Sequence, residues 1–179
     1  MMNVTTAVAL MALTATATLI SAQEPTAFHA ERVVRTGHFT LAASPDKVFP
    51  LFTPLGELHW ATGWDPTVLY PADGHPVEGL LFRTNDHGGM YWWLTHYEPE
   101  RHAIEYHAIV PEGFARNIRV ECKAAGNRTE VTVTDTYIAL SEHGNAFIRS
   151  LDEASYARKM KAWEEPISRY LKTGEEPRK

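Results

Sequence analysis

The segment that decides the fold is Asn145–Leu171, which reads NAFIRSLDEASYARKMKAWEEPISRYL. Most of its apolar residues follow one another at steps of three or four positions, which is the spacing of one face of an α-helix. These residues are Phe147, Leu151, Ala154, Met160, Trp163, Ile167, Tyr170 and Leu171. Charged residues fill most of the other positions. The pattern predicts a long amphipathic helix that ends the domain and buries its apolar face against the rest of the chain.

Two residues modify this prediction. Pro166 lies inside the periodic run, where its missing N–H should kink or split the helix between Ala162 and Glu165. Ser141 can cap a helix that begins earlier and includes Gly144. We therefore expect the part of the helix before Pro166 to cover any cavity that the fold encloses.

Short segments rich in β-branched and aromatic residues precede the helix, and turns of Gly, Pro, Asn and Asp separate them. This alternation is typical of an antiparallel meander. A first strand is predicted at 31–41, and Ser44-Pro45 after it predicts two short helices, with Ser as cap and Pro in the first turn. Six more strands are predicted at 67–70, 79–85, 90–97, 102–110, 114–123 and 129–139. The fold class is therefore α+β, with a seven-stranded curved antiparallel sheet wrapped around the C-terminal helix.

Several motifs in this arrangement resemble a known superfamily. They are Ser44-Pro45-x-x-Val48-Phe49 leading to Trp60, Trp92-x-Leu94-x-x-Tyr97-x-Pro99, Ile104-x-Tyr106, and Leu140-Ser141-x-x-Gly144-Asn145 leading to Trp163. Over residues 31–174 the chain resembles the SRPBCC superfamily, the START-like and polyketide-cyclase-like proteins, and in particular its exported bacterial members. The resemblance implies the helix-grip fold, with an apolar ligand cavity between sheet and helix. It implies no single activity, because such folds host binders, cyclases and chaperone regulators.

The N-terminal segment 1–22 carries no charge and ends in Ile20-Ser21-Ala22, which resembles a signal-peptidase site. We predict a signal peptide and export to the periplasm or the medium. The positively charged start of such peptides is missing, so an uncleaved membrane anchor and a misassigned start codon are the alternatives; about 20 apolar residues can span a bilayer. A linker at 23–30, the SRPBCC/START-like domain at 31–174 and a tail at 175–179 complete the division.

Composition excludes several classes of function. The chain has 179 residues, a net charge of −5 and one cysteine. A nucleic-acid partner is not expected, because phosphate binding needs clustered Lys and Arg, and a membrane is expected only through an uncleaved N-terminal segment. Cys122 should be a buried thiol. The nine histidines are scattered without metal-ligand spacing, and no phosphate-binding loop occurs, so we predict neither metal nor cofactor. The oligomeric state stays open.

The hairpin formed by 114–123 and 129–139 carries the first candidate site. With Gly126 in its turn, the expected register places Val120 opposite Val131, Ile118 opposite Val133, Arg116 opposite Asp135 and Phe114 opposite Tyr137. All of these would face inward, because alternate residues of a strand share a face. An Arg116–Asp135 pair would then project into the cavity, where buried charges need partners. The alternative is a twisted hairpin with a solvated pair.

The hairpin formed by 90–97 and 102–110 is more ambiguous. Pairing around Pro99 matches Trp92 with His107, which would place Trp92, His107, Arg116 and Asp135 in one row across the cavity floor. Such a row suits a polar ligand head or acid–base chemistry. The opposite face, with Trp93 and Tyr106, is more apolar and competes for the core side.

These patterns leave three functional hypotheses. The first is a non-enzymatic carrier or sensor that binds or transports a lipophilic small molecule. The second is a polyketide cyclase or dehydratase acting on an aromatic or polyketide-type substrate, with His107 or Asp135 as base and Arg116 polarising a carbonyl. The third is an interaction module of the chaperone-regulator kind. The predicted ligand-binding residues are Trp64, Phe82, Trp92, His107, Phe114, Arg116, Asp135, Tyr137, Tyr156, Met160 and Trp163.

Overall fold

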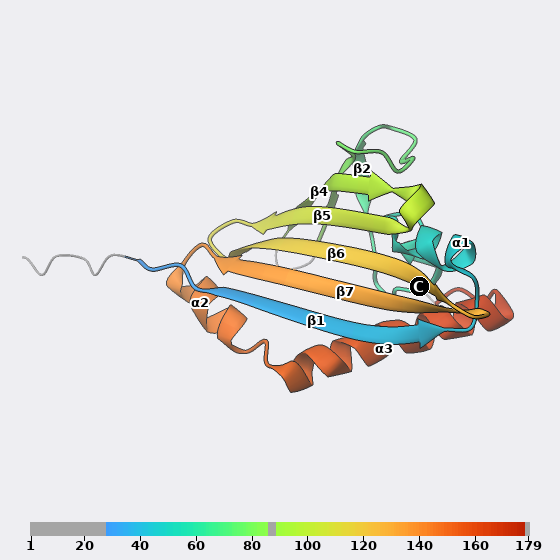
Figure 1. The fold of residues 1–179 in the computed structure, drawn as a ribbon. Coiled ribbons are helices and arrows are strands. Elements are labelled where there is room, and N and C mark those ends of the chain that lie inside the picture. Colours follow the sequence, from blue (N-terminus) through green and yellow to red (C-terminus); the bar gives the residue numbers. More distant parts are fainter. Residues whose placement is uncertain (1–27, 86–88, 178–179) are drawn as a thin grey trace, which may run out of the picture.

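The computed structural model describes residues 28–85 and 89–177, in which a curved antiparallel sheet lies along a long C-terminal helix (Figure 1). The sheet has seven strands in the order β1-β7-β6-β5-β4-β3-β2. Their bounds are β1 Arg32–Leu41, β2 Thr67–Tyr70, β3 Leu81–Thr84, β4 Met90–Glu98, β5 Ala103–Val110, β6 Phe114–Ala125 and β7 Arg128–Ala139. Only β1 is out of chain order, because it pairs with β7.

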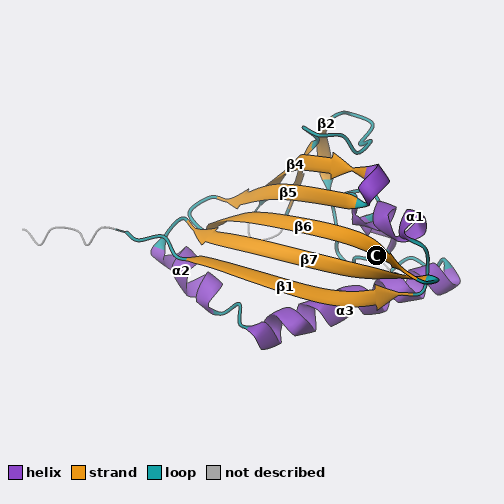
Figure 2. Cartoon of the chain, in the orientation of Figure 1, coloured by secondary structure: helices purple, strands orange, loops and turns teal. Residues whose placement is uncertain are grey.

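The helices follow the predicted order. Two short helical segments come after β1: α1 (Pro45–Val48), continued by the 3-10 turn η1 (Phe49–Phe52), and then η2 (Glu57–His59). A further 3-10 turn, η4 (Pro99–Arg101), connects β4 to β5, and α2 (Glu142–Arg149) and α3 (Glu153–Thr173) end the domain. Figure 2 shows α3 running along the sheet beside β1. The predicted α+β helix-grip fold is confirmed.

The core lies between the sheet and α3. Alternate residues of β6 and β7 face it, and Val131 and Val133 have no exposed surface. On the helix, Tyr156, Met160 and Ile167 are buried against them. The alternation of residues along the strands and the helical spacing along α3 each place apolar residues on one face, and these two faces pack against each other.

The prediction of a single helix from Asn145 to Leu171 is wrong, because the helix is interrupted between α2 and α3. The Asp152 carboxylate accepts a hydrogen bond from the Ser155 amide at 2.6 Å and starts a second helix there. The earlier start is correct: Ser141 Oγ accepts from the Gly144 amide at 3.0 Å and caps α2. The predicted split at Pro166 is also wrong, since α3 continues through it.

The predicted register of the β6–β7 hairpin is wrong by two residues. Ala125 pairs with Arg128 around a two-residue turn, in which Gly126 has a φ of 64°. Asp135 is therefore paired with Ile118, and Arg116 with Tyr137. A shift of two residues preserves the side to which each side chain points, so the inward face is the predicted one.

The predicted register of the β4–β5 hairpin is wrong by one residue, which matters more. Trp92 pairs with Ala108 and Trp93 with His107, and the register shifts between Leu94 and His96. This bulge inserts an extra residue that the sequence pattern did not reveal. His107 therefore shares the exposed outer face with Trp93, and the predicted row that joined it to Trp92, Arg116 and Asp135 does not form.

The predicted signal peptide or anchor at 1–22 lies outside the described residues, as does most of the linker at 23–30. Export and anchoring therefore stay predictions. Within the described ranges, no helix is long and apolar enough to cross a membrane. Cys122 is buried as expected.

Candidate functional site

A cavity of about 240 Å³ lies between the short helices, strands β3 to β6 and α3. Its lining is mainly aromatic and aliphatic: Phe52, Pro54, Trp60, Ala61, Trp64, Phe82, Met90, Trp92, Tyr106, Ile118, Val120 and Trp163. Three charged residues, Glu57, Arg116 and Lys159, complete it. A concave apolar site with a few convergent polar groups is the usual form of a small-molecule pocket.

Strand pairing positions the aromatic side of the cavity. Phe82 and Trp92 are direct partners in β3 and β4, and their rings stack 5.8 Å apart with an interplanar angle of 1°. Trp64 meets both rings edge-on at 5.9 and 6.1 Å. Such contacts fix the rings as a rigid surface against which a flat apolar molecule can pack.

The polar atoms of these aromatic residues already have partners inside the protein. Trp60 Nε1 donates to the Leu51 carbonyl at 2.7 Å, and Trp64 Nε1 donates to the Pro54 carbonyl at 2.8 Å. Trp92 Nε1 donates to Thr84 Oγ1 at 3.1 Å, and the Tyr106 hydroxyl donates to the Phe52 carbonyl at 3.1 Å. These four side chains therefore offer a ligand mainly apolar surface.

An ion cluster on β6, β7 and α3 forms the polar end of the cavity. Arg116 Nε donates to Asp135 Oδ1 at 2.6 Å, and Lys159 Nζ donates to Asp135 Oδ2 at 2.6 Å. The Tyr156 hydroxyl also donates to Oδ2, at 3.0 Å. Asp135 has no exposed surface. Burial alone would raise the pKa of its carboxyl, but the charges and hydrogen bonds of Arg116 and Lys159 outweigh burial and lower that pKa.

Arg116 holds its guanidinium between two aromatic rings. Its Cζ lies 5.3 Å from the centre of the Trp92 ring and 5.4 Å from that of Tyr137, as in cation–π contacts. Burial opposes its charge, but the nearby Asp135 carboxylate raises the pKa above the ordinary arginine value, so Arg116 stays charged. Among the described residues, its Nη2 is the only buried side-chain nitrogen or oxygen without a hydrogen-bond partner.

Lys159 is a lining residue whose charge can change near neutral pH. Burial and, second to it, the charge of Arg116 lower its pKa to about 8, and Asp135 only partly opposes these two effects. Its Nζ lies 5.2 Å from the centre of the Trp163 ring. A desolvated lysine beside a second cation is a recognised route to an amine that can exchange protons near neutral pH.

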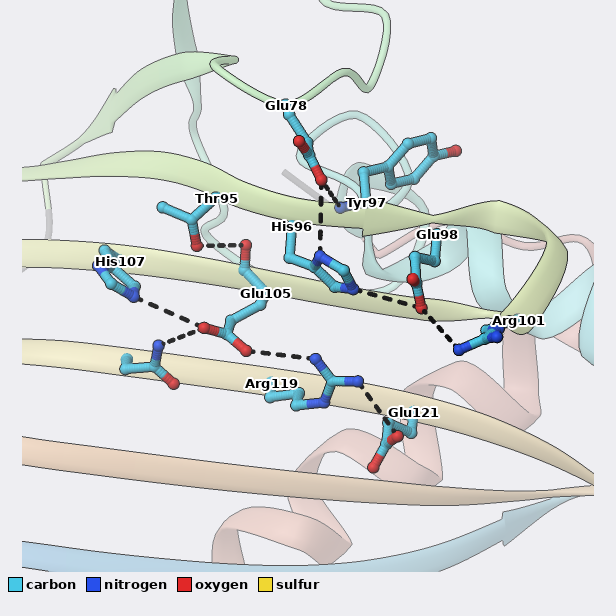
Figure 3. Close-up of polar contacts among 11 residues, drawn as sticks. Glu78, Thr95, His96, Tyr97, Glu98, Arg101, Glu105, His107, Arg119 and Glu121 are labelled. Atoms are coloured by element: carbon cyan, nitrogen blue, oxygen red, sulfur yellow. Dashed lines mark hydrogen bonds and ion pairs between the residues drawn. The ribbon is translucent and has the colours of Figure 1, made fainter.

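His107 belongs to a separate polar network on the outer face of the sheet (Figure 3). Its Nε2 lies 3.6 Å from Glu105 Oε1. Glu105 also accepts hydrogen bonds from Asn117 at 2.7 Å and Arg119 at 3.3 Å, and Arg119 reaches Glu121 at 3.3 Å. His107 is thus not positioned to act in the cavity.

The other sequence-predicted residues divide into two groups. Trp64, Phe82, Trp92, Arg116 and Trp163 line the cavity. Asp135, Tyr156, Phe114, Tyr137 and Met160 are buried but lie outside its lining. Asp135 accepts hydrogen bonds from both Lys159 and Tyr156. Phe114 instead stacks on Phe147, with the ring centres 4.6 Å apart.

Sequence reasoning missed Lys159, Glu57, Trp60 and Tyr106 as lining residues. Lys159 was counted on the charged side of the helix, although it lies four residues before Trp163 and therefore on the same face. That spacing was the available indication. Tyr106 was missed because the β4 bulge was not foreseen.

The chain matches no protein-family model and no curated protein sequence. Solved structures do match its fold. Norcoclaurine synthase from Thalictrum flavum, in complex with dopamine and hydroxybenzaldehyde, is 11% identical with a TM-score of 0.60, covering 83% of this chain and 91% of that one. Zhui aromatase/cyclase from Streptomyces sp. R1128 is 14% identical with a TM-score of 0.56, covering 82% and 98%. Mll3558 from Rhizobium loti is 19% identical with a TM-score of 0.56, covering 78% and 99%.

These similarities, together with the sheet and helix described above, establish the class of structure. The chain has the helix-grip fold that these structures share, which is the fold that the sequence motifs implied. At such identities the similarity concerns the fold, so the function has to be argued from the cavity itself.

The described residues define what the cavity can do chemically. It can enclose a flat apolar body, donate a hydrogen bond from Arg116, and exchange a proton through Lys159. Within the described ranges, no group of three or more His, Cys, Asp or Glu side chains is arranged to hold a metal ion.

Proposed function

We propose that this protein binds a small lipophilic, aromatic molecule in the cavity between the sheet and α3. The observation that carries the proposal is the aromatic lining, whose indole and phenol hydrogens are already bonded within the protein for Trp60, Trp64, Trp92 and Tyr106. Such a surface gains little from water and favours apolar contact. The protein would act as a carrier or sensor rather than as an enzyme.

The size of the cavity narrows the ligand. Sites for drug-sized molecules usually have about 300–1,000 Å³, whereas this cavity has about 240 Å³. A compound with one or two rings fits that volume better than a sterol or a long acyl chain. Dopamine and hydroxybenzaldehyde, named in the norcoclaurine synthase complex, are of this single-ring size and support the proposal by analogy.

Export would place the carrier outside the cytoplasm. This part of the proposal rests on the uncharged segment 1–22 and its Ser21-Ala22 end. Mass spectrometry of the mature protein tests it: an N-terminus at Gln23 is expected, and an intact Met1 in a membrane fraction would favour the anchor.

Binding can be tested with 2-naphthol, a neutral two-ring probe, by isothermal titration calorimetry near pH 7. Ala61→Phe adds a ring to the cavity lining, and Leu58→Phe adds the same ring at an exposed site next to it. We expect Ala61→Phe to weaken binding at least about tenfold and Leu58→Phe to leave it unchanged. Equal affinity in both variants would show that the probe binds elsewhere, and a folded wild-type protein that binds neither naphthol nor other two-ring compounds would refute the proposal.

An enzyme is the second candidate, and Lys159 is the observation in its favour. The bases first considered do not suit the role: His107 lies on the outer face, and both oxygens of Asp135 are engaged in the buried cluster. Lys159, with a pKa of about 8, could exchange the proton while Arg116 polarises a carbonyl. Zhui aromatase/cyclase is a neighbour in fold.

The two candidates differ in what happens to the bound compound. A carrier returns it unchanged, whereas a cyclase or dehydratase converts a poly-β-ketone into a ring or removes water from it. To separate them, a poly-β-ketone that can cyclise to an aromatic ring is incubated with the protein or with Lys159→Met as the control variant. Mass spectrometry then shows whether the compound has been converted. If the protein is instead an interaction module of the chaperone-regulator kind, Ala61→Phe should leave the binding of its protein partner unchanged.

A further inference from the structure

The polar end of the cavity contains a donor that the protein leaves unused. Arg116 Nε donates a hydrogen bond to Asp135, and the guanidinium lies between the rings of Trp92 and Tyr137. Its Nη2, however, is buried without a hydrogen-bond acceptor. A buried donor without an acceptor costs free energy that a ligand acceptor would return. Arg116 lines the cavity and its side chain keeps 11% of its surface exposed, so its guanidinium can meet an acceptor of the bound molecule.

The charges around Arg116 decide what kind of acceptor is favoured. Two cations, Arg116 and Lys159, face one fully buried carboxylate, Asp135. The oxygens of Asp135 are already engaged, Oδ1 by Arg116 and Oδ2 by Lys159 and Tyr156. Glu57 also lines the cavity and helps to keep Lys159 protonated.

Tyrosines supply the remaining titratable groups at this end. Burial raises the pKa of Tyr137 to about 12 and raises that of Tyr106 and Tyr156 as well, so all three are neutral near pH 7. Even with Glu57 on the lining, the pKa of Lys159 stays well below the ordinary lysine value. Asp135 and Glu57 favour the protonated amine, but burial and Arg116 outweigh them, so a further anion beside Lys159 would stabilise its charge.

We propose that the ligand is an aromatic carboxylic acid, bound with its ring against Trp92 and Phe82 and its carboxylate on the Arg116 guanidinium, beside Lys159. This inference rests on the proposed function, since it names the class of the bound aromatic compound. Charge-assisted hydrogen bonds to a carboxylate are roughly twice as strong as neutral ones, so the acid gains more than a neutral acceptor of the same shape.

The arrangement links ligand binding to a proton. A carboxylate placed beside Lys159 raises the pKa of that amine, because an opposite charge favours the protonated form. Near pH 8, where the free protein carries a partly neutral Lys159, binding therefore takes up protons. The affinity for the acid falls as the pH rises above 8, although the acid itself is fully ionised throughout.

The test compares 2-naphthoate with 2-naphthamide, its uncharged isostere, by titration calorimetry on the wild-type protein. At pH 7 we expect the carboxylate to bind about 10- to 100-fold more tightly. At pH 8, titrations in buffers of different ionisation enthalpy should reveal proton uptake with naphthoate only. Equal affinities without proton uptake would overturn the inference and leave the proposed aromatic site intact, whereas no binding of either compound would overturn both.

Three variants locate the effect. Arg116→Met removes the donor while Asp135 keeps Lys159 and Tyr156, and should abolish the preference for naphthoate. Lys159→Met should abolish the proton uptake. Arg119→Met changes a cation on the same strand that bonds to outer-face carboxylates, and should change neither. If Arg116→Met does not fold, the isostere and pH comparisons on the wild-type protein still decide; a retained preference in a folded Arg116→Met would refute the assignment.

Discussion

Arg116 and Asp135 form a buried ion pair along a diagonal of the sheet. Arg116 Nε lies 2.6 Å from Asp135 Oδ1, although the backbone partner of Asp135 is Ile118 and that of Arg116 is Tyr137. Diagonal neighbours on one face of a sheet are within reach of long side chains. The pair thus joins β6 to β7 beneath the cavity, and Lys159 adds α3 to the same carboxylate.

Removing the charge of Asp135 should destabilise the fold strongly. Asp135→Asn keeps the size of the side chain but leaves Arg116 and Lys159 buried without their counter-charge, at an expected cost of about 3–5 kcal/mol in the free energy of unfolding. Urea denaturation at pH 7 measures this loss. Glu105→Gln is the matched control, because Glu105 pairs with Arg119 on the partly exposed outer face, where such a change costs about 1 kcal/mol or less. Similar losses in both variants would contradict a dominant role of the buried cluster.

The two hairpins show what the sequence could predict and why the rest was hidden. Turn residues and alternation located every strand, and the expected β6–β7 register erred by two residues. Because side chains alternate with a period of two, that error kept Arg116 and Asp135 on the inner face, where the long arginine reaches its diagonal neighbour. The β4–β5 register erred by one residue, through a bulge near Thr95, and this moved His107 to the opposite face.

The helix and the cavity show a similar division. The helical period was correct, but the sequence pattern did not distinguish Asp152, the cap that starts α3, from the other charged residues of one helix face. The aromatic lining was partly predicted from composition, since large apolar residues have to pack somewhere. The pKa of Lys159 depends on the depth of burial and on Arg116, a residue 43 positions away in the sequence, so no local pattern contains it.

The buried amine of Lys159 should make stability depend on pH with a definite sign. Its pKa in the folded protein is about 8, below the ordinary lysine value of 10.5 that it regains on unfolding. Between these values the unfolded state binds more protons, so the free energy of unfolding rises with pH. Below pH 8 both states are protonated and the contribution is constant.

The measurement is the difference between the wild-type protein and Lys159→Met in urea denaturation from pH 7 to pH 10. Titration of tyrosines and of Cys122 affects both proteins and largely cancels in the difference. We expect the free energy of unfolding of the wild-type protein to increase relative to that of Lys159→Met from about pH 8 upward. Parallel curves would mean that Lys159 has an ordinary pKa in the folded state.

Cys122 should be unreactive until the protein unfolds. Its side chain is 2% exposed, and burial raises the pKa of its thiol to about 12, so the reactive thiolate is scarce at pH 8. We expect 5,5′-dithiobis(2-nitrobenzoate) to label the native protein very slowly and the urea-unfolded protein at once. Rapid labelling of the native protein would show that the β6–β7 hairpin opens without global unfolding.

Gly144 provides a prediction opposite to ordinary helix propensity. Gly144 lies within α2, where replacing glycine by alanine normally stabilises a helix by about 1 kcal/mol. Here an added Cβ would lie 1.8 Å from the carbonyl oxygen of Gly113. That carbonyl cannot easily move, because it accepts a hydrogen bond from the Leu140 amide at 2.8 Å. Gly144→Ala should therefore destabilise the protein by about 1–3 kcal/mol, as overpacking does.

Ala146 in the same helix gives the matched comparison. Its side chain is exposed, so Ala146→Gly should show the ordinary propensity, a loss of about 1 kcal/mol. Thermal and urea denaturation of both variants then separate the two effects, because propensity alone predicts that alanine is preferred at both positions. If Gly144→Ala stabilises the protein, α2 is not held against the β5–β6 turn as closely as the contact with Gly113 requires. If it destabilises, the close approach explains why glycine is needed at the position that follows the Ser141 cap by three residues.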